Sequence, residues 1–172
     1  MDLREAILAE HSKRQALLIR DYIGTSQSLF DELMYYFFCD EYRLAQRAAW
    51  AVSHCIDQYP WLINSHLEKL VNYLSKENIH VAVKRNAVRI LQNLDLPEEL
   101  LGTLADVCFN FLANPKEAAA VRIFSMQILF NICKKEPDLA SELKLIIEEF
   151  LPYATAGFKS RGKKILKGIA KL

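Results

Sequence analysis

The sequence predicts an all-α protein built as a helical solenoid, and three observations lead to this fold class. The 172 residues include only five glycines and five prolines, while Leu, Ala, Lys and Glu dominate the long segments. Apolar residues in these segments recur with the spacing of one helical face and do not alternate as in strands. The third observation is a repeat of about 38 residues that holds two amphipathic helices, which must stack on their neighbours to bury their apolar faces.

The repeat is clearest in the second helix of each pair. Gln46–Asp57 aligns with Lys84–Asp95 without a gap, and further shifts reach Arg122–Cys133 and Ser160–Lys171. Each copy has an arginine near its start, followed in most copies by a small residue and apolar residues at helical spacing. The first helices repeat as well, since Leu67, Leu70, Val71 and Leu74 match Ala105, Cys108, Phe109 and Leu112.

The element boundaries follow from this periodicity and from turn residues. Gly24 supplies the stop of one helix, and Ser26 supplies the cap of the next one. Pro60, Pro97 and Pro137 each stand at a helix start, where the missing N–H and the fixed φ of proline are suitable. In chain order, the predicted helices are 2–10, 12–23, 27–38, 42–58, 61–74, 79–94, 97–112, 117–134, 138–151 and 157–171.

With this period and its repeated arginine, the chain resembles the HEAT and armadillo class of α-solenoids, most closely HEAT repeats. The arginines that carry the resemblance are Arg47, Arg85, Arg122 and Arg161, with Arg14 in a degenerate first copy. Arg122 departs by one position, because strict register places Ile123 there. The resemblance implies a right-handed α-α superhelix of about four to five two-helix repeats. We expect a single domain over 1–172, with a degenerate repeat at 1–41, regular repeats at 42–153 and a basic capping helix at 154–172.

The resemblance also implies a binding surface along the second helices, which usually line the concave side of HEAT-like folds. Its candidate residues are Arg47, Trp50, His54, Lys84, Arg85, Arg89, Gln92 and Arg122. The repeated arginines either hold the repeats in register, by pairing with acids or helix ends, or contact a ligand. Trp50 aligns with Val88 and Met126, so it is either a packing residue or a partly exposed anchor. We expect His54 to be a lone surface or hydrogen-bonded histidine.

Charge is distributed unevenly along the chain, although the net charge is only +1. No acid occurs from Ala154 to the end, where the basic residues are Lys159, Arg161, Lys163, Lys164, Lys167 and Lys171. In the repeat alignment, Lys163 takes the small position of Ala49 and Ala87. This patch is either a polar cap for the last repeat or a cap that also contacts an acidic partner or a phosphate backbone.

Catalytic, metal and membrane functions have little support in the sequence. It contains no GxSxG or HExxH motif and no phosphate-binding glycine loop. Cys39, Cys55, Cys108 and Cys133 form no CxxC pair, so reduced core thiols are expected and a zinc site is not. The N-terminal segment mixes acids into its apolar residues, unlike a signal peptide or membrane anchor. We therefore expect a cytoplasmic protein without a cofactor.

Two function hypotheses follow. The first is a non-enzymatic scaffold or adaptor that binds another protein along its second helices. The alternative is a nucleic-acid-binding or alkylated-DNA repair protein, because HEAT-like alkylpurine DNA glycosylases combine basic residues, tryptophans and a catalytic aspartate on their concave surface. In this chain His54 follows Trp50 by one turn and Asp57 lies further along, so adjacent residues do not reproduce that aromatic-carboxylate pocket.

Overall fold

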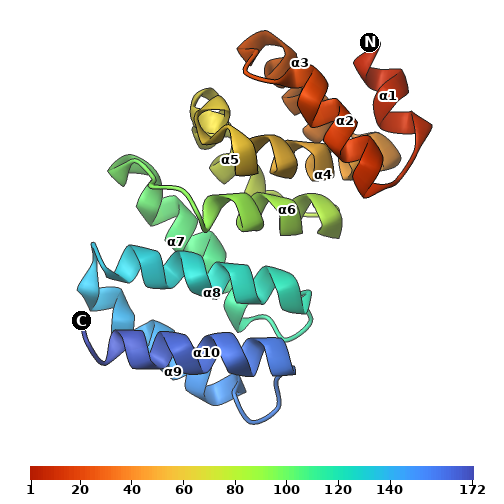
Figure 1. Ribbon diagram of the computed structural model, residues 1–172. Coiled ribbons are helices and arrows are strands. Elements are labelled where there is room, and N and C mark those ends of the chain that lie inside the picture. Colours follow the sequence, from red (N-terminus) through yellow and green to blue (C-terminus); the bar gives the residue numbers. More distant parts are fainter. The chain divides into compact units, whose positions relative to one another are not determined.

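The structure is a computed structural model that describes residues 1–172, and every regular element in it is helical (Figure 1). Each of the ten predicted segments contains an α-helix, so the all-α prediction is confirmed. The helices are α1 (Leu3–Ala9), α2 (Lys13–Ile23), α3 (Gln27–Phe37), α4 (Tyr42–Gln58), α5 (Leu67–Leu74), α6 (Val81–Leu91), α7 (Glu98–Ala113), α8 (Ala119–Cys133), α9 (Ala140–Phe150) and α10 (Ala156–Ile169).

Two predicted helices begin in a different form from the one expected. A 3₁₀ helix, η1 (Pro60–His66), precedes α5, and a shorter one, η2 (Pro137–Leu139), precedes α9. Each starts at a proline, and 3₁₀ turns are common at the N-termini of α-helices. Helix α6 ends at Leu91, three residues earlier than predicted, and Leu94 N–H then bonds to the Leu91 carbonyl in a turn.

Short polar side chains cap several helices where the sequence changes from turn to helix. Ser12, Ser26 and Thr155 each accept a hydrogen bond from the backbone N–H three residues later. Gly24 follows α2 with a φ of 49°, a conformation that favours glycine, and its N–H bonds to the Arg20 carbonyl. The predicted stop at Gly24 and cap at Ser26 are therefore confirmed.

The chain packs into two compact units, Met1–Ile90 and Leu91–Leu172. In the first unit, α4 packs against α1, α2 and α3, and its alanines at 45, 48, 49 and 51 are buried at these contacts. In the second unit, α8 packs against α7 and α10, and the view in Figure 1 shows α8 and α10 side by side. We call α4, α6, α8 and α10 the second helices of their pairs.

The last copy of the repeat is displaced by one residue from its predicted alignment. The sequence placed Lys163 at the small position of Ala49, Ala87 and Ser125, which are all fully buried. In the structure Gly162 is buried and Lys163 is exposed. The added Cβ of a larger residue at 162 would lie 3.0 Å from Cγ2 of Ile147, so the close approach of α9 explains the glycine.

The cysteines are all unpaired, as expected for reduced thiols. Cys55, Cys108 and Cys133 are buried, whereas Cys39 is half-buried. Burial raises the pKa of the Cys55 and Cys108 thiols to about 12. These three cysteines therefore behave as small apolar core residues. None of the helices combines the length and the apolar character that a membrane crossing needs.

Candidate functional site

The repeated arginine of α4 is directed at the end of another helix. Arg47 is half-buried, and its NH1 donates to the Leu8 carbonyl at 2.6 Å, with the Ile7 carbonyl 3.5 Å away. Both carbonyls belong to the last turn of α1, where a helix leaves carbonyl groups unpaired and its dipole is negative. Arg47 therefore completes a helix end, which is the register role considered for this position.

Arg122 lies in the interior, and this corrects its place on the predicted binding surface. Only 8% of the residue is exposed, and its Nε donates to the carbonyl of Leu112 in α7 at 2.9 Å. Its guanidinium lies 4.3 Å from the ring centre of Phe150 and 4.9 Å from that of Phe158. The one-residue departure from strict register explains the difference, because one residue rotates a side chain by about 100° around a helix.

Arg161 also makes an internal contact, at the start of a chain of hydrogen bonds through α8. Its NH1 donates to Oε1 of Gln127 at 2.7 Å, and Gln127 Nε2 donates to Oδ1 of Asn131 at 3.0 Å. Asn131 Nδ2 then donates to the Gln92 carbonyl at 2.9 Å. The chain ties α10 to α8 and α8 to the turn that follows α6. Both Arg161 and the backbone of Gln92 thus have structural partners.

The three basic residues predicted on α6 lie in different surroundings. Arg85 is exposed, whereas Lys84 and Arg89 are half-buried. The NH2 group of Arg89 is 2.7 Å from Oδ2 of Asp57, which lies in the last turn of α4. Of the four repeated arginines, Arg47 and Arg161 are half-buried and Arg122 is buried, so Arg85 is the one that is exposed.

The structure brings three of the predicted residues together in the first unit: Trp50, His54 and Arg89. The Trp50 ring is half-buried and lies 6.3 Å from the His54 ring and 5.4 Å from the His11 ring, measured between centroids. Nδ1 of His54 is 3.9 Å from the Asp57 oxygen that Arg89 contacts. This distance is beyond a hydrogen bond, so the pair is not arranged for proton transfer.

Burial dominates the electrostatics of His54. It lowers the pKa of the imidazole, and the opposing effect of Asp57 is countered by Arg89, Lys13 and Arg20. Nε2 of His54 and NH1 of Arg89 are both shielded from solvent and have no hydrogen-bond partner. The histidine is therefore a partly buried neutral group and not the lone surface residue that the sequence allowed.

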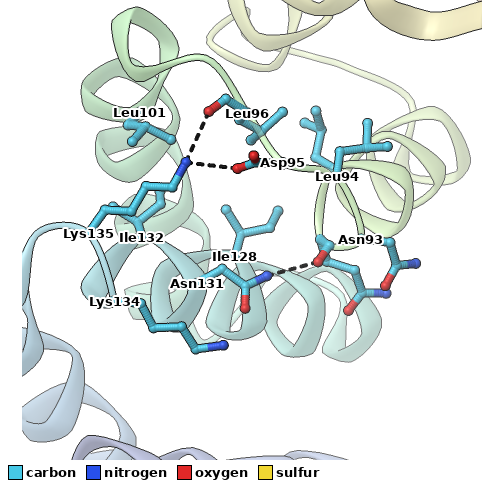
Figure 2. A pocket seen from close by; sticks show the side chains of 12 residues that line it. Asn93, Leu94, Asp95, Leu96, Leu101, Ile128, Asn131, Ile132, Lys134 and Lys135 are labelled. Atoms are coloured by element: carbon cyan, nitrogen blue, oxygen red, sulfur yellow. Dashed lines mark hydrogen bonds and ion pairs between the residues drawn. The ribbon is translucent and has the colours of Figure 1, made fainter. Parts of the chain in front are cut away.

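A groove in the second unit lies beside α8 (Figure 2). Its cavity measures about 310 Å³, and it is lined by residues 91–96, by Leu101 of α7, and by Ile128, Asn131, Ile132, Lys134 and Lys135. Figure 2 shows Lys135 reaching toward Asp95 and Leu96. Its Nζ lies 2.8 Å from Oδ1 of Asp95 and 3.4 Å from the Leu96 carbonyl, and Asn131 Nδ2 donates to the Gln92 carbonyl. We call this the α8 groove; it has an apolar floor and polar bridges.

Most residues of the α8 groove were not among the sequence candidates, since only Gln92 was named. One signal could have revealed more of it. Asn93 and Asn131 are separated by the repeat period and therefore occupy equivalent positions in two copies. The structure places both at the groove, whereas the aligned position in the first copy is Cys55. Polar residues that recur at equivalent repeat positions can therefore indicate a surface site, which the apolar pattern does not show.

A second hollow, of about 520 Å³, lies on the first unit where α5 meets the residue that follows α3. Two aromatic rings in it are covered by lysines. Lys69 Nζ lies 4.5 Å from the ring centre of Phe38, and Lys76 Nζ lies 5.2 Å from that of Tyr73. Because these rings already have cationic partners, this hollow is the weaker of the two candidate sites.

The basic residues of the C-terminal patch divide into two groups. Lys163, Lys164, Lys167 and Lys171 are exposed, whereas Lys159 and Arg161 are half-buried. We call the four exposed residues the α10 lysine face.

No group of three or more His, Cys, Asp or Glu side chains is placed to hold a metal ion. A family model described as HEAT repeat domain matches residues 3–169 of the chain. No curated protein and no solved structure matches the sequence.

Proposed function

The chain belongs to the HEAT repeat domain family, and we propose that it is a non-enzymatic scaffold or adaptor that binds another protein along its second helices. Repeats of this kind stack into extended surfaces that suit macromolecular partners. The observation that carries the proposal is the α8 groove, because it lies on a second helix and combines an apolar floor with polar groups at its rim.

The size and lining of the α8 groove fit part of a protein better than a whole cofactor. Its volume of about 310 Å³ is at the lower end of the range for small-molecule sites. Leu94 is the half-buried apolar residue of the lining and offers contact for one or two side chains of a partner, whereas Ile128 and Ile132 form the buried floor. The exposed carboxamide of Asn93 can donate and accept hydrogen bonds with the peptide groups next to those side chains.

The nucleic-acid hypothesis has less support at the predicted arginines. Phosphate binding requires guanidinium groups that are free to meet the backbone of a nucleic acid. Arg47 and Arg122 instead donate to backbone carbonyls, and Arg89 pairs with Asp57. A partner of the second helices would therefore meet fewer free cations than the sequence indicated.

The proposal is tested with peptides selected from a random library on the intact protein. A peptide that occupies the α8 groove should bind the Leu94→Asp variant about tenfold more weakly or worse, because the substitution places a carboxylate at an apolar lining position. Fluorescence anisotropy with the labelled peptide measures the dissociation constant.

Leu145→Asp is the matched control, because Leu145 is 66% exposed on α9 and does not line the groove. It adds the same charge to the same unit and should leave the dissociation constant within about twofold. Selected peptides that bind wild type and Leu94→Asp equally well would remove the groove from the proposal. A library that yields no binding peptide would count against a protein-binding role.

A further inference from the structure

The α10 lysine face presents a row of cations that have no partner within the chain. Lys163, Lys167 and Lys171 recur every fourth residue, and Lys164 lies beside them. Lys163 and Lys167 lie in α10, where this spacing places side chains on one face about 6 Å apart, and Lys171 lies in the turn that follows the helix. All four are exposed, and none forms an ion pair, whereas Lys135 and Lys144 elsewhere in the unit pair with Asp95 and Glu148.

Within the second unit, the acidic and basic residues lie in different parts of the sequence. Residues 91–153 carry ten acidic and five basic residues, and residues 154–172 carry six basic residues and no acid. A solubilising cap requires polar residues, and the helix dipole favours cations over acids near the last turn of α10, where Lys167 lies. Lys163 and Lys164 lie before that turn, so the dipole does not account for their charge, which points to an anionic partner.

The helix that carries the lysines is held closely against α8. An added Cβ at Gly168 would collide with the Phe130 ring, and one at Gly157 would lie 3.2 Å from Cδ1 of Ile123. Arg161 adds its hydrogen bond to Gln127 on the same side. These contacts fix the backbone of α10, so the helical positions that carry Lys163, Lys164 and Lys167 are preorganised before a partner binds.

We propose that the α10 lysine face binds an acidic helical segment of a partner protein. Glutamates placed every fourth residue on such a helix repeat at the same interval of about 6 Å and can face Lys163 and Lys167 in turn, while Lys171 lies in the turn beyond α10. The inference shares with the proposed function the assumption of a protein partner, but it uses a different surface from the α8 groove.

Two features favour a short acidic segment over a nucleic acid. The sequence from Lys163 to Lys171 contains no aromatic residue to stack on bases and no arginine to read base edges. A nucleic acid is also a long polyanion, and the ten acids on the same unit would repel the parts of it that extend past α10. A short segment can contact α10 alone.

The test uses a labelled alanine-rich helical peptide with glutamate at every fourth residue and a comparison peptide with glutamine in its place. Binding to the intact protein is measured by fluorescence anisotropy at low and at physiological salt. We expect the glutamate peptide to bind more tightly than the glutamine peptide and to weaken with salt. The double variant Lys163→Glu plus Lys167→Glu should weaken its binding about tenfold.

The matched control is Lys13→Glu plus Arg43→Glu, which changes the net charge equally at two exposed positions in the first unit. This control should bind the glutamate peptide nearly as wild type does, and so should Leu94→Asp, which separates this surface from the α8 groove. If both double variants weakened binding of the glutamate peptide equally, the net charge of the protein would explain the effect, and the proposal would be overturned. Tighter binding of duplex or single-stranded DNA than of the peptide, at the same salt, would also overturn it.

Discussion

Arg122 and Arg85 carry the repeated arginine of two successive copies, one position apart in register, and lie in opposite environments. Arg122 is buried between two aromatic rings and donates to the Leu112 carbonyl, whereas Arg85 is exposed. We predict that Arg122→Ala lowers the free energy of unfolding by about 2 to 3 kcal/mol, since it removes a cation–π contact and leaves a cavity and an unpaired carbonyl. Arg85→Ala should change it by no more than about 0.5 kcal/mol. Urea denaturation measures the free energy of unfolding of both variants. Equal losses would contradict the structural role of Arg122.

His54 gives a prediction about pH. Burial holds its pKa below the ordinary value of 6.5 in the folded protein, so the unfolded chain binds the proton more readily. The stability contributed by neutral His54 is full above about pH 6.5 and falls as the pH drops through the lower pKa of the folded state. His54→Gln should therefore show a smaller loss of unfolding free energy on acidification. A pKa of His54 above 6.5, measured by NMR titration, would contradict this prediction.

At the scale of the element, we predict that replacing glycine with alanine has opposite effects on the free energy of unfolding at two helical positions. Gly102 lies exposed within α7, and an added Cβ there meets nothing within 4 Å. Gly102→Ala should raise the free energy of unfolding by about 0.5 to 1 kcal/mol through helix propensity. Gly168→Ala has the same gain in propensity, but its Cβ collides with the Phe130 ring, so we predict a net loss of stability of about 1 kcal/mol.

The collision can be tested directly by changing the other partner. Phe130→Leu shortens the side chain that an added Cβ at 168 would meet. In a double-mutant cycle, Gly168→Ala should therefore cost less in the Phe130→Leu background than in wild type. Additive losses measured by urea denaturation would show that the glycine is not required by the approach of α8.

At the scale of the whole molecule, the sequence predicts one domain while the helices pack into two compact units. Both tryptophans, Trp50 and Trp61, lie in the first unit, and helices that contribute to circular dichroism lie in both. If the chain is one domain, as we propose, unfolding followed by tryptophan fluorescence and by circular dichroism should give coincident transitions. A fluorescence transition displaced from the dichroism transition would show that the units unfold separately.

The helices were predictable because each depends on its own sequence. Apolar spacing in windows such as 27–38 and 42–58 identified α3 and α4, and local capping residues such as Ser26 set their starts. The family resemblance rested on the same periodicity and on the repeated arginine. The boundaries that differed, such as the early end of α6, lie where turn hydrogen bonds compete with helical ones.

The site was less predictable because a repeat position does not determine what a side chain contacts. The arginine motif grouped Arg47, Arg122 and Arg161, but Arg47 donates to a carbonyl at the end of α1, Arg122 to the Leu112 carbonyl and Arg161 to the side chain of Gln127. The α8 groove was missed because its walls come from the turn after α6, from α7 and from α8. A cavity between segments leaves no local pattern in any one of them.

The sequence by itself determined the helices, their pairing into repeats and the separation of charge at the C-terminus, because these depend on residues close together in the chain. Only the tertiary structure decided which arginines are enclosed, that Gly162 and not Lys163 is buried in α10, and that Asn93 and Asn131 meet at one groove. These features depend on how closely neighbouring helices approach, and a shift of a single residue turns a side chain from solvent to core.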